Sequence, residues 1–218
     1  MTTMSQSQSP QAPAPEPPPV VQPAPATARY RVTFDATWSA ATHPVDWPDS
    51  AHWSPLVGGT HDSTVTFWQE GGTATLGIRD VAERGLTFRL EGEIGAAIGR
   101  GAEASFTGGN IGRSPGSASV EFNISQRYPL VTLVSMVAPS PDWFVGVAGL
   151  PLFESNQWVS SKRVELVPWD AGTDCGATFT SPDCPRTPQI PISRIVTAPL
   201  SPNGMVRSLG TFTFERLQ

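Results

Sequence analysis

The chain has 218 residues and a formal net charge of −5, and charged residues make up only 15% of it. With 14 Lys and Arg against 19 acidic residues and no basic cluster, the composition argues against a surface that reads nucleic acid. No run approaches the roughly 20 apolar residues that cross a bilayer. The 20 glycines and 23 prolines are typical of many short strands joined by tight turns.

The first 27 residues are rich in Pro, Ala, Gln and Ser and show no apolar periodicity. Such a segment cannot bury enough apolar surface to offset the entropy of ordering it, so 1–27 is predicted to be a disordered, partly polyproline-II arm. A spacer is the favoured role, and a ligand for a proline-binding domain is the alternative. Residues 28–218 are enough for one domain with a substantial core. No basic segment followed by an apolar run, as in a signal peptide, is visible.

A half-buried strand is predicted at the start of this domain, because Tyr30, Val32 and Phe34 alternate with polar residues. A loop-like region rich in proline follows, with three histidines among three tryptophans. These are His43, His52 and His61, with Trp38, Trp47 and Trp53. The wide spacing and the lack of a nearby Cys disfavour a zinc site. The histidines are expected to bind loop carbonyls, and the tryptophans to fill the flank of the core or face a glycan or membrane.

Two short helices are predicted next, after a short strand at Thr64–Trp68. The segment Thr75–Gly85 has a Thr at its start, apolar residues such as Ile78 and Val81 at helical spacing, and a Gly where a helix would stop. The segment Leu86–Ile98 also shows apolar spacings of three and four. Both patterns favour helix.

The second half of the chain reads as strands. The glycine-rich stretch GGNIGRSPG lacks the lysine-serine pair of a phosphate loop, and we interpret it as a hairpin loop. From Ser117 the runs SVEFNIS, LVTLVSMVA and DWFVGVAGL predict central strands of a sandwich. The run RVELVPW then leads to an aspartate-rich turn. Further strands are predicted at Ile192–Ala198 and Gly210–Leu217.

Three carboxylates, Asp142, Asp170 and Asp174, stand at the ends of apolar, strand-like runs. Carboxylate oxygens at turn positions suit Ca²⁺, which takes about 6–8 oxygen ligands and tolerates irregular geometry. Gly172 between the last two acids permits a sharp turn that can aim both side chains at one point. The pattern suggests a calcium site. The alternative is that Asp170 and Asp174 hydrogen-bond their own turn and Asp142 merely begins a strand.

Two cysteines, Cys175 and Cys184, enclose a short loop directly after this turn. A disulfide is favoured, and it would fit an oxidising compartment, whereas a reducing cytosol would leave two thiols. A metal site would need more soft ligands than the loop offers. A redox pair would more usually be Cys-x-x-Cys.

The segments SPDWFVGV and PWDAGTDCG together resemble the N-terminal spondin domain family. The earlier stretches YRVTFDATWSAATHPVDWP, HWSPLVGGTHD and WQEGGTATLGIRDVAERG look like the opening of the same domain, so the resemblance covers about residues 29–218. It implies an antiparallel β-sandwich similar to C2 domains, here with one or two short helices. It also implies a calcium ion held by Asp142, Asp170 and Asp174, and a role in extracellular adhesion and matrix contact.

The expected function is therefore a calcium-binding, non-enzymatic recognition domain, secreted or at the cell surface, whose partner is a carbohydrate or a matrix or cell-surface glycoprotein. Trp143 and Trp53 are the candidates for stacking on a sugar. A calcium-dependent membrane-lipid module is one alternative, although no basic patch is available for anionic headgroups. A metal-dependent hydrolase is another, but the chain contains neither G-x-S-x-G nor H-E-x-x-H.

Overall fold

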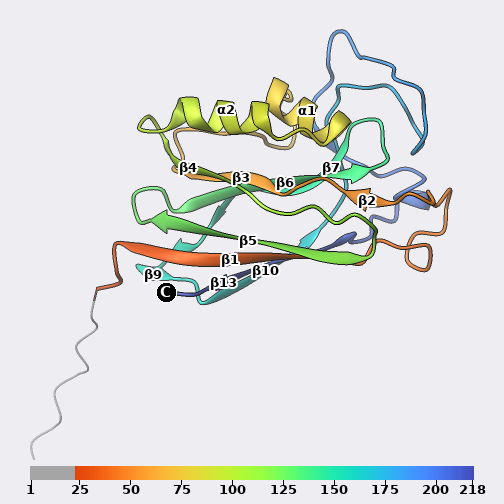
Figure 1. The fold of residues 1–218 in the computed structure, drawn as a ribbon. Helices are drawn as coiled ribbons and strands as arrows, with labels where there is room; N and C mark the ends of the chain where they lie inside the picture. The colour runs from red at the N-terminus through yellow and green to blue at the C-terminus, as the bar shows by residue number, and fades with distance from the viewer. Residues whose placement is uncertain (1–22) are drawn as a thin grey trace, which may run out of the picture.

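The computed structural model describes residues 23–218 (Figure 1). The predicted N-terminal arm therefore lies largely outside the described residues. Strand β1 (Thr27–Ala36) opens the domain. Just before it, the carbonyl oxygen of Pro25 accepts hydrogen bonds from Gln126 Nε2 at 3.0 Å and from Trp158 Nε1 at 2.7 Å, which ties this part of the chain to the domain.

Two antiparallel sheets form a sandwich, which confirms the predicted fold class (Figure 1). The four-stranded sheet has the order β10 (Ser161–Leu166), β13 (Gly210–Arg216), β1, β5 (Gly116–Ser125). The larger sheet has the order β12 (Ser193–Arg194), β11 (Trp169–Asp170), β7 (Trp143–Pro151), β6 (Leu130–Ala138), β3 (Val57–His61), β4 (Ala102–Thr107), and β2 (His52–Trp53) pairs with β6. A small hairpin joins β8 (Phe153–Glu154) to β9 (Gln157–Trp158), and a 3₁₀ turn spans Pro202–Gly204.

The main core lies between the sheets and follows from the alternation in β1. Tyr30, Val32 and Phe34 are all buried, and β1 pairs with β13 so that Phe34 lies opposite Phe212. The rings of Phe34 and Phe212 meet edge to face with centroids 5.2 Å apart, a geometry that aromatic pairs favour. The outward side chains of β1 are mostly exposed, which confirms the predicted half-buried strand.

The two predicted helices are present as α1 (Leu76–Arg84) and α2 (Phe88–Ala97), and they cover the outer face of the larger sheet (Figure 1). Thr75 Oγ1 accepts a hydrogen bond from the Ile78 N–H at 3.1 Å, and Gly85 ends the helix in the left-handed region at φ 66°. Glu93 of α2 accepts the Gly77 N–H at 2.7 Å, so α2 helps to cap α1. No helix within residues 23–218 is long and apolar enough to cross a membrane.

The predicted strand at Thr64–Trp68 is wrong, and the strand in this part of the chain is β3, slightly earlier. Two glycines in β3 explain the error, because they interrupt the apolar alternation. A Cβ at Gly58 would lie 2.1 Å from the Thr132 carbonyl oxygen, and one at Gly59 would lie 2.8 Å from the Ile94 side chain. Close approach of a neighbouring strand and of α2 therefore requires glycine here.

The glycine-rich segment GGNIGRSPG is not a hairpin loop. It connects β4 in the larger sheet to β5 in the smaller one, so the chain crosses between the layers there. Strand β5 is consequently an edge strand, whereas β6 and β7 are interior strands as predicted. The strand predicted at Ile192–Ala198 is reduced to the two residues of β12, and the rest of that segment is irregular.

Candidate metal centre

The pairing of β7 with β11 brings two of the three predicted aspartates together. Asp170 lies opposite Trp143 in the register, and the Ala171 N–H donates to the Asp142 carbonyl at 3.0 Å. Gly172 then turns the chain at φ 75°, and a Cβ there would lie 2.0 Å from the Ile190 carbonyl oxygen. Only glycine fits this turn. It returns the chain so that Asp174 follows within the same cluster.

Asp142 is fully buried, and its two carboxylate oxygens have different surroundings. Oδ2 accepts hydrogen bonds from the Thr173 N–H at 2.7 Å, the Asp174 N–H at 3.0 Å and the Thr173 hydroxyl at 3.2 Å. Oδ1 is buried and has no hydrogen-bond partner within the described residues. Burial, followed by the charge of Asp170, raises the pKa of Asp142 to about 6.

Asp170 and Asp174 each accept a hydrogen bond from the second N–H downstream, at Gly172 and Gly176, both at 2.7 Å. This is the turn geometry that the alternative interpretation of the sequence described. The other oxygen of Asp174 accepts the Cys184 N–H at 2.7 Å. Burial raises the pKa of Asp170. The hydrogen bond from the Gly172 N–H and the charge of Arg186 lower this pKa, and the charge of Asp174 raises it, so the net shift is upward.

The donor set fits a hard cation in chemistry and less well in geometry. Asp170 is coupled electrostatically to both other aspartates, and the orphaned Oδ1 of Asp142 is an oxygen that a cation would satisfy. Across residues 23–218, however, no group of three or more acidic, His or Cys side chains is gathered tightly enough to hold an ion. A shell that uses all three carboxylates requires them to converge further than they do here.

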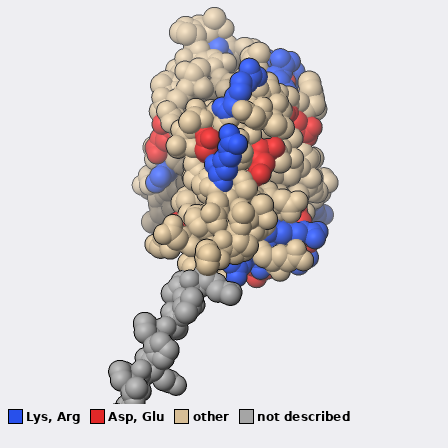
Figure 2. Space-filling model, turned by 90° about the vertical axis from the view of Figure 1, so that its left-hand side faces the viewer, with Lys and Arg blue, Asp and Glu red and all other residues tan. Residues whose placement is uncertain are grey.

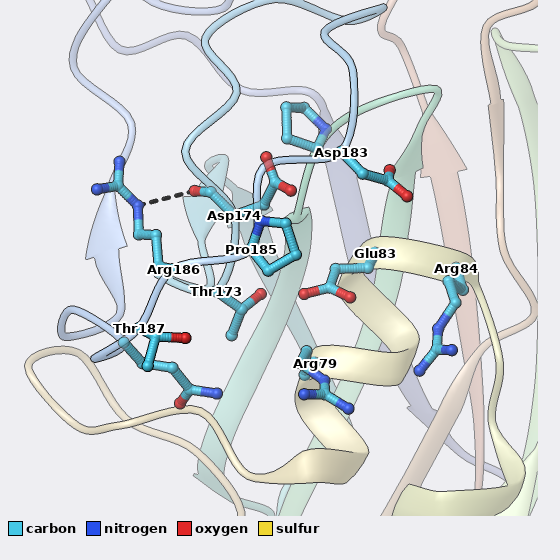
Figure 3. Close-up of a pocket in the computed structure, with 11 residues that line it drawn as sticks. Arg79, Glu83, Arg84, Thr173, Asp174, Asp183, Pro185, Arg186 and Thr187 are labelled. Carbon is cyan, nitrogen blue, oxygen red and sulfur yellow. Dashed lines mark hydrogen bonds between the residues drawn. The ribbon is translucent and has the colours of Figure 1, made fainter.

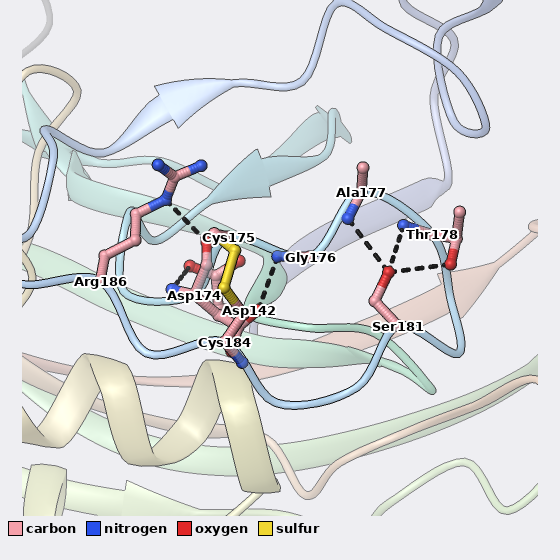
Figure 4. Close-up of a disulfide and its surroundings, with 9 residues drawn as sticks. All are labelled: Asp142, Asp174, Cys175, Gly176, Ala177, Thr178, Ser181, Cys184 and Arg186. Carbon is pink, nitrogen blue, oxygen red and sulfur yellow. Dashed lines mark hydrogen bonds between the residues drawn. A yellow bond between two sulfur atoms is a disulfide. The ribbon is translucent and has the colours of Figure 1, made fainter.

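The predicted disulfide between Cys175 and Cys184 is confirmed, with the two Cα atoms 5.1 Å apart (Figure 4). The Cys175 N–H also donates to the Cys184 carbonyl at 2.8 Å, and Arg186 Nε donates to the Asp174 carbonyl at 2.8 Å. The base of the loop 175–184, which we call the disulfide loop, is thus attached directly to the aspartate turn.

Two pockets flank this turn. One, of about 330 Å³, lies between α1 and the turn, and in Figure 3 the Glu83 carboxylate points across it toward Thr173. Burial raises the pKa of Glu83, although the Thr173 side chain and nearby arginines act in the opposite direction. The other, of about 300 Å³, is lined by Trp143 and Asp170 among others. Glu83 was not predicted, because a lone acid on a short helix carries no distinctive sequence signal.

The three histidines do not gather into one site. His43 lies 3.0 Å from the Thr42 hydroxyl, and His52 lies 2.6 Å from the Ser50 carbonyl. The buried His61 lies between the Asp62 carbonyl and the Thr132 hydroxyl, each at 2.8 Å. His52 and His61 each contact a carbonyl, as expected, whereas His43 contacts a hydroxyl, and His61 lies at the end of strand β3 rather than in a loop.

The two tryptophans predicted to stack on a sugar are buried, which corrects that prediction. Trp53 is 0% exposed and donates from Nε1 to Ser114 Oγ at 3.0 Å. Trp143 is 3% exposed and packs edge to face against Phe179 with centroids 5.3 Å apart. Both rings fill the core, so neither presents a face to a ligand. Six of the seven tryptophans are at most 8% exposed, whereas Trp47 is only partly buried.

Comparison with known proteins shows where this chain has relatives. The sequence model of the family described as Spondin_N matches residues 28–205. The chain is 36% identical over 198 residues to Spondin-2 of Homo sapiens, covering 88% of this chain and 58% of the relative. It is 36% identical over 208 residues to Spondin-1 of Rattus norvegicus, covering 88% of this chain and 25% of the relative. The chain thus spans little more than half of the first relative and a quarter of the second.

Proposed function

The chain belongs to the Spondin_N family, and from this premise we propose that it is an extracellular, non-enzymatic recognition domain whose binding depends on a calcium ion. The partner class that we propose is a carbohydrate or a matrix or cell-surface glycoprotein. The disulfide supports an oxidising, extracellular location, because such bonds are rare in a reducing cytosol.

The observation that carries the calcium proposal is the buried, unpartnered Oδ1 of Asp142 beside the Asp170 carboxylate. An unpaired buried acceptor and a neighbouring like charge both destabilise the folded domain, and a bound cation relieves both. The ligands proposed are Asp142, Asp170 and Asp174, with carbonyl oxygens or waters completing the shell. Oxygen donors alone favour Ca²⁺ over Zn²⁺, since the two cysteines are bonded to each other.

Calcium would act on recognition through the loops attached to the aspartate turn. Asp174 holds the backbone N–H groups of Gly176 and Cys184, so its side chain fixes both ends of the disulfide loop. A cation that orders Asp174 thereby orders that loop as well. Surface loops on a rigid sandwich are where binding residues commonly lie.

A glycan or glycoprotein partner is favoured over an anionic membrane. The net charge is −5, and on the face in Figure 2 basic and acidic side chains are interspersed rather than gathered by sign. Anionic lipids attract clusters of basic residues. Catalysis is disfavoured because the histidines are each bound locally, apart from the aspartates.

The test is adhesion of the domain to immobilised glycans and matrix proteins in calcium and then in EGTA. Capture is expected in calcium and should be lost with the chelator. The variant Asp170→Asn should lose it as well. Asp35→Asn, which changes an exposed carboxylate on the opposite sheet, serves as the matched control and should behave as the wild type. If adhesion is the same in EGTA as in calcium, the proposed calcium dependence is contradicted. Turnover of a captured polymer would contradict the non-enzymatic assignment.

A further inference from the structure

A third pocket, of about 680 Å³, lies between two loops that are far apart in the sequence. One wall is the proline-rich loop 44–48, and the other is the tip of the disulfide loop. The lining residues are Pro44, Asp46, Trp47, Pro48, Thr178, Phe179 and Thr180. Neither the predicted metal ligands nor the tryptophans expected to stack on a sugar belong to this pocket.

Trp47 gives the pocket an aromatic surface that is held in place but not covered. Its ring packs against the buried Trp38 with centroids 4.9 Å apart and an interplanar angle of 63°. The ring is nevertheless only partly buried, whereas each of the other six tryptophans is at most 8% exposed. A large, rigid aromatic surface of this kind suits an apolar ligand face at low entropic cost.

Polar groups converge around this ring. Asp46 and Thr180 are exposed, and both line the pocket. Thr178 also lines the pocket, and its hydroxyl lies 2.9 Å from Ser181 Oγ. Asp46 adopts φ 49°, a left-handed conformation that Asp and Asn tolerate better than most residues. The turn therefore fixes where its carboxylate emerges.

We propose that this pocket binds one neutral pyranose ring of a glycan. The apolar C–H face of the sugar stacks on Trp47, and its hydroxyls donate to the Asp46 carboxylate and bond to Thr180. The ligand class, a glycan, rests on the proposed function. The inference adds where on the domain the sugar binds and that a neutral sugar is preferred over an acidic one. An acidic sugar is disfavoured because its carboxylate would face Asp46. Two threonine hydroxyls favour a polyol over a simple ammonium group.

The pocket is also connected to the aspartate turn through Phe179. That ring lies with its centroid 5.5 Å from Trp38 and 5.3 Å from Trp143, so it anchors the tip of the disulfide loop in the core. The base of the same loop is held by the disulfide and by Asp174 (Figure 4). Disorder in the turn would move Thr178 and Thr180 relative to Trp47, so sugar binding should weaken when calcium is removed.

The first measurement uses the fluorescence of Trp47, the tryptophan that acrylamide can reach. The whole chain is titrated in calcium with free glucose, galactose, mannose and N-acetylglucosamine at millimolar concentrations. At least one sugar should reduce the acrylamide quenching. The variant Trp47→Phe should lose both the quenched component and its protection, while the aromatic contact with Trp38 is largely retained.

The second measurement is glycan-array binding of Asp46→Asn and Thr180→Ala, each expected to weaken capture at least tenfold. Asn keeps the left-handed preference of position 46, so the variant removes the charge without disturbing the turn. Asp49→Asn, an exposed neighbour that does not line the pocket, is the matched control. These exposed positions keep the test available even where Trp47→Phe fails to fold.

The outcomes separate this pocket from the proposed function. If glycan capture is unchanged in Asp46→Asn, Thr180→Ala and Trp47→Phe, the assignment of this pocket as the sugar site is wrong, and the proposed recognition function still stands. If the wild-type chain binds calcium and matrix protein but no glycan, the assignment of the pocket as a sugar site is also wrong, while the proposed function still stands. Tetramethylammonium is titrated in the same way as a cationic comparison. Protection of Trp47 by this cation and by none of the sugars would overturn the proposed ligand class. Loss of all calcium-dependent capture in the wild type counts against the proposed function itself.

Discussion

Replacing Asp142 with Asn should stabilise the domain when calcium is chelated. Asp142 is fully buried, and its pKa rises from 3.8 to about 6. A difference of this size corresponds to about 3 kcal/mol by which the ionised carboxylate disfavours the folded state at neutral pH. Asn removes that charge and keeps an oxygen for the Thr173 and Asp174 N–H donors. Its NH2 group places two unpaired N–H donors where the carboxylate has the already unpaired Oδ1, at a net cost of about 1 kcal/mol. A net gain of about 2 kcal/mol is therefore expected.

The pH dependence of the wild type in EGTA has a defined sign. Because the folded pKa of Asp142 lies above the unfolded value, the folded state takes up the proton first as the pH falls. The free energy of unfolding should therefore rise as the pH falls from about 7 through 6 toward 3.8. Asp142→Asn should lack most of this rise. Asp170, whose pKa is also raised, contributes with the same sign in both proteins.

The assay is urea unfolding followed by tryptophan fluorescence at pH 7.5 and pH 5, in EGTA and in calcium. In calcium the order of stabilities should reverse, because a ligand that binds only the folded state stabilises the wild type and not the variant. Asp35→Asn should match the wild type throughout. A variant that is clearly less stable than the wild type in EGTA at pH 7.5, or a wild type without pH dependence, would refute this electrostatic reasoning.

Three further outcomes are expected. Replacing Cys175 and Cys184 together with Ser should lower the free energy of unfolding by about 2–3 kcal/mol in the chain-entropy account, and limited proteolysis should cut the loop first; an uncut loop argues against it. Gly58→Ala should lower the melting temperature, since overpacking costs about 1–3 kcal/mol and the added Cβ meets Thr132; unchanged melting contradicts the close strand approach. Asp80→Asn should cost about 2 kcal/mol, discounted because the arginines that Asp80 pairs with are about half exposed. Because the pKa of Asp80 is lowered, the cost of this substitution should begin to shrink as the pH falls below about 3.8, and a cost that is larger at low pH than at neutral pH argues otherwise.

Local signals in the sequence were sufficient for the elements that depend on local physics. Thr75 and Gly85 mark the ends of α1 because a side-chain cap and a left-handed residue leave recognisable residue types. The alternation in β1 likewise identifies its buried face. Strand β3 could not be predicted, because its glycines are required by close contacts with distant parts of the chain. Gly58, for example, lies against Thr132, more than 70 residues away, and no local sequence pattern indicates that contact.

The candidate site shows the same division. The aspartates and the disulfide follow from residue types and from family resemblance, and the structure brings Asp142 and Asp170 together through the pairing of β7 with β11. Exposure of tryptophan could not be predicted, because all seven lie in apolar or loop contexts that look alike in sequence. Trp53 is enclosed by the sheets, whereas Trp47 is left partly open by the loop that faces it.

Calorimetric titration of the folded domain with Ca²⁺ tests the central claim most directly. One site is expected in the wild type, with much weaker binding of Zn²⁺. Affinity for Ca²⁺ should fall at least tenfold in Asp142→Ala, Asp170→Asn and Asp174→Ala and should be unchanged in Asp35→Ala. Calcium affinity that is the same in all of these variants, or no calcium binding by the wild type, would contradict the assignment of the aspartate turn as a calcium centre.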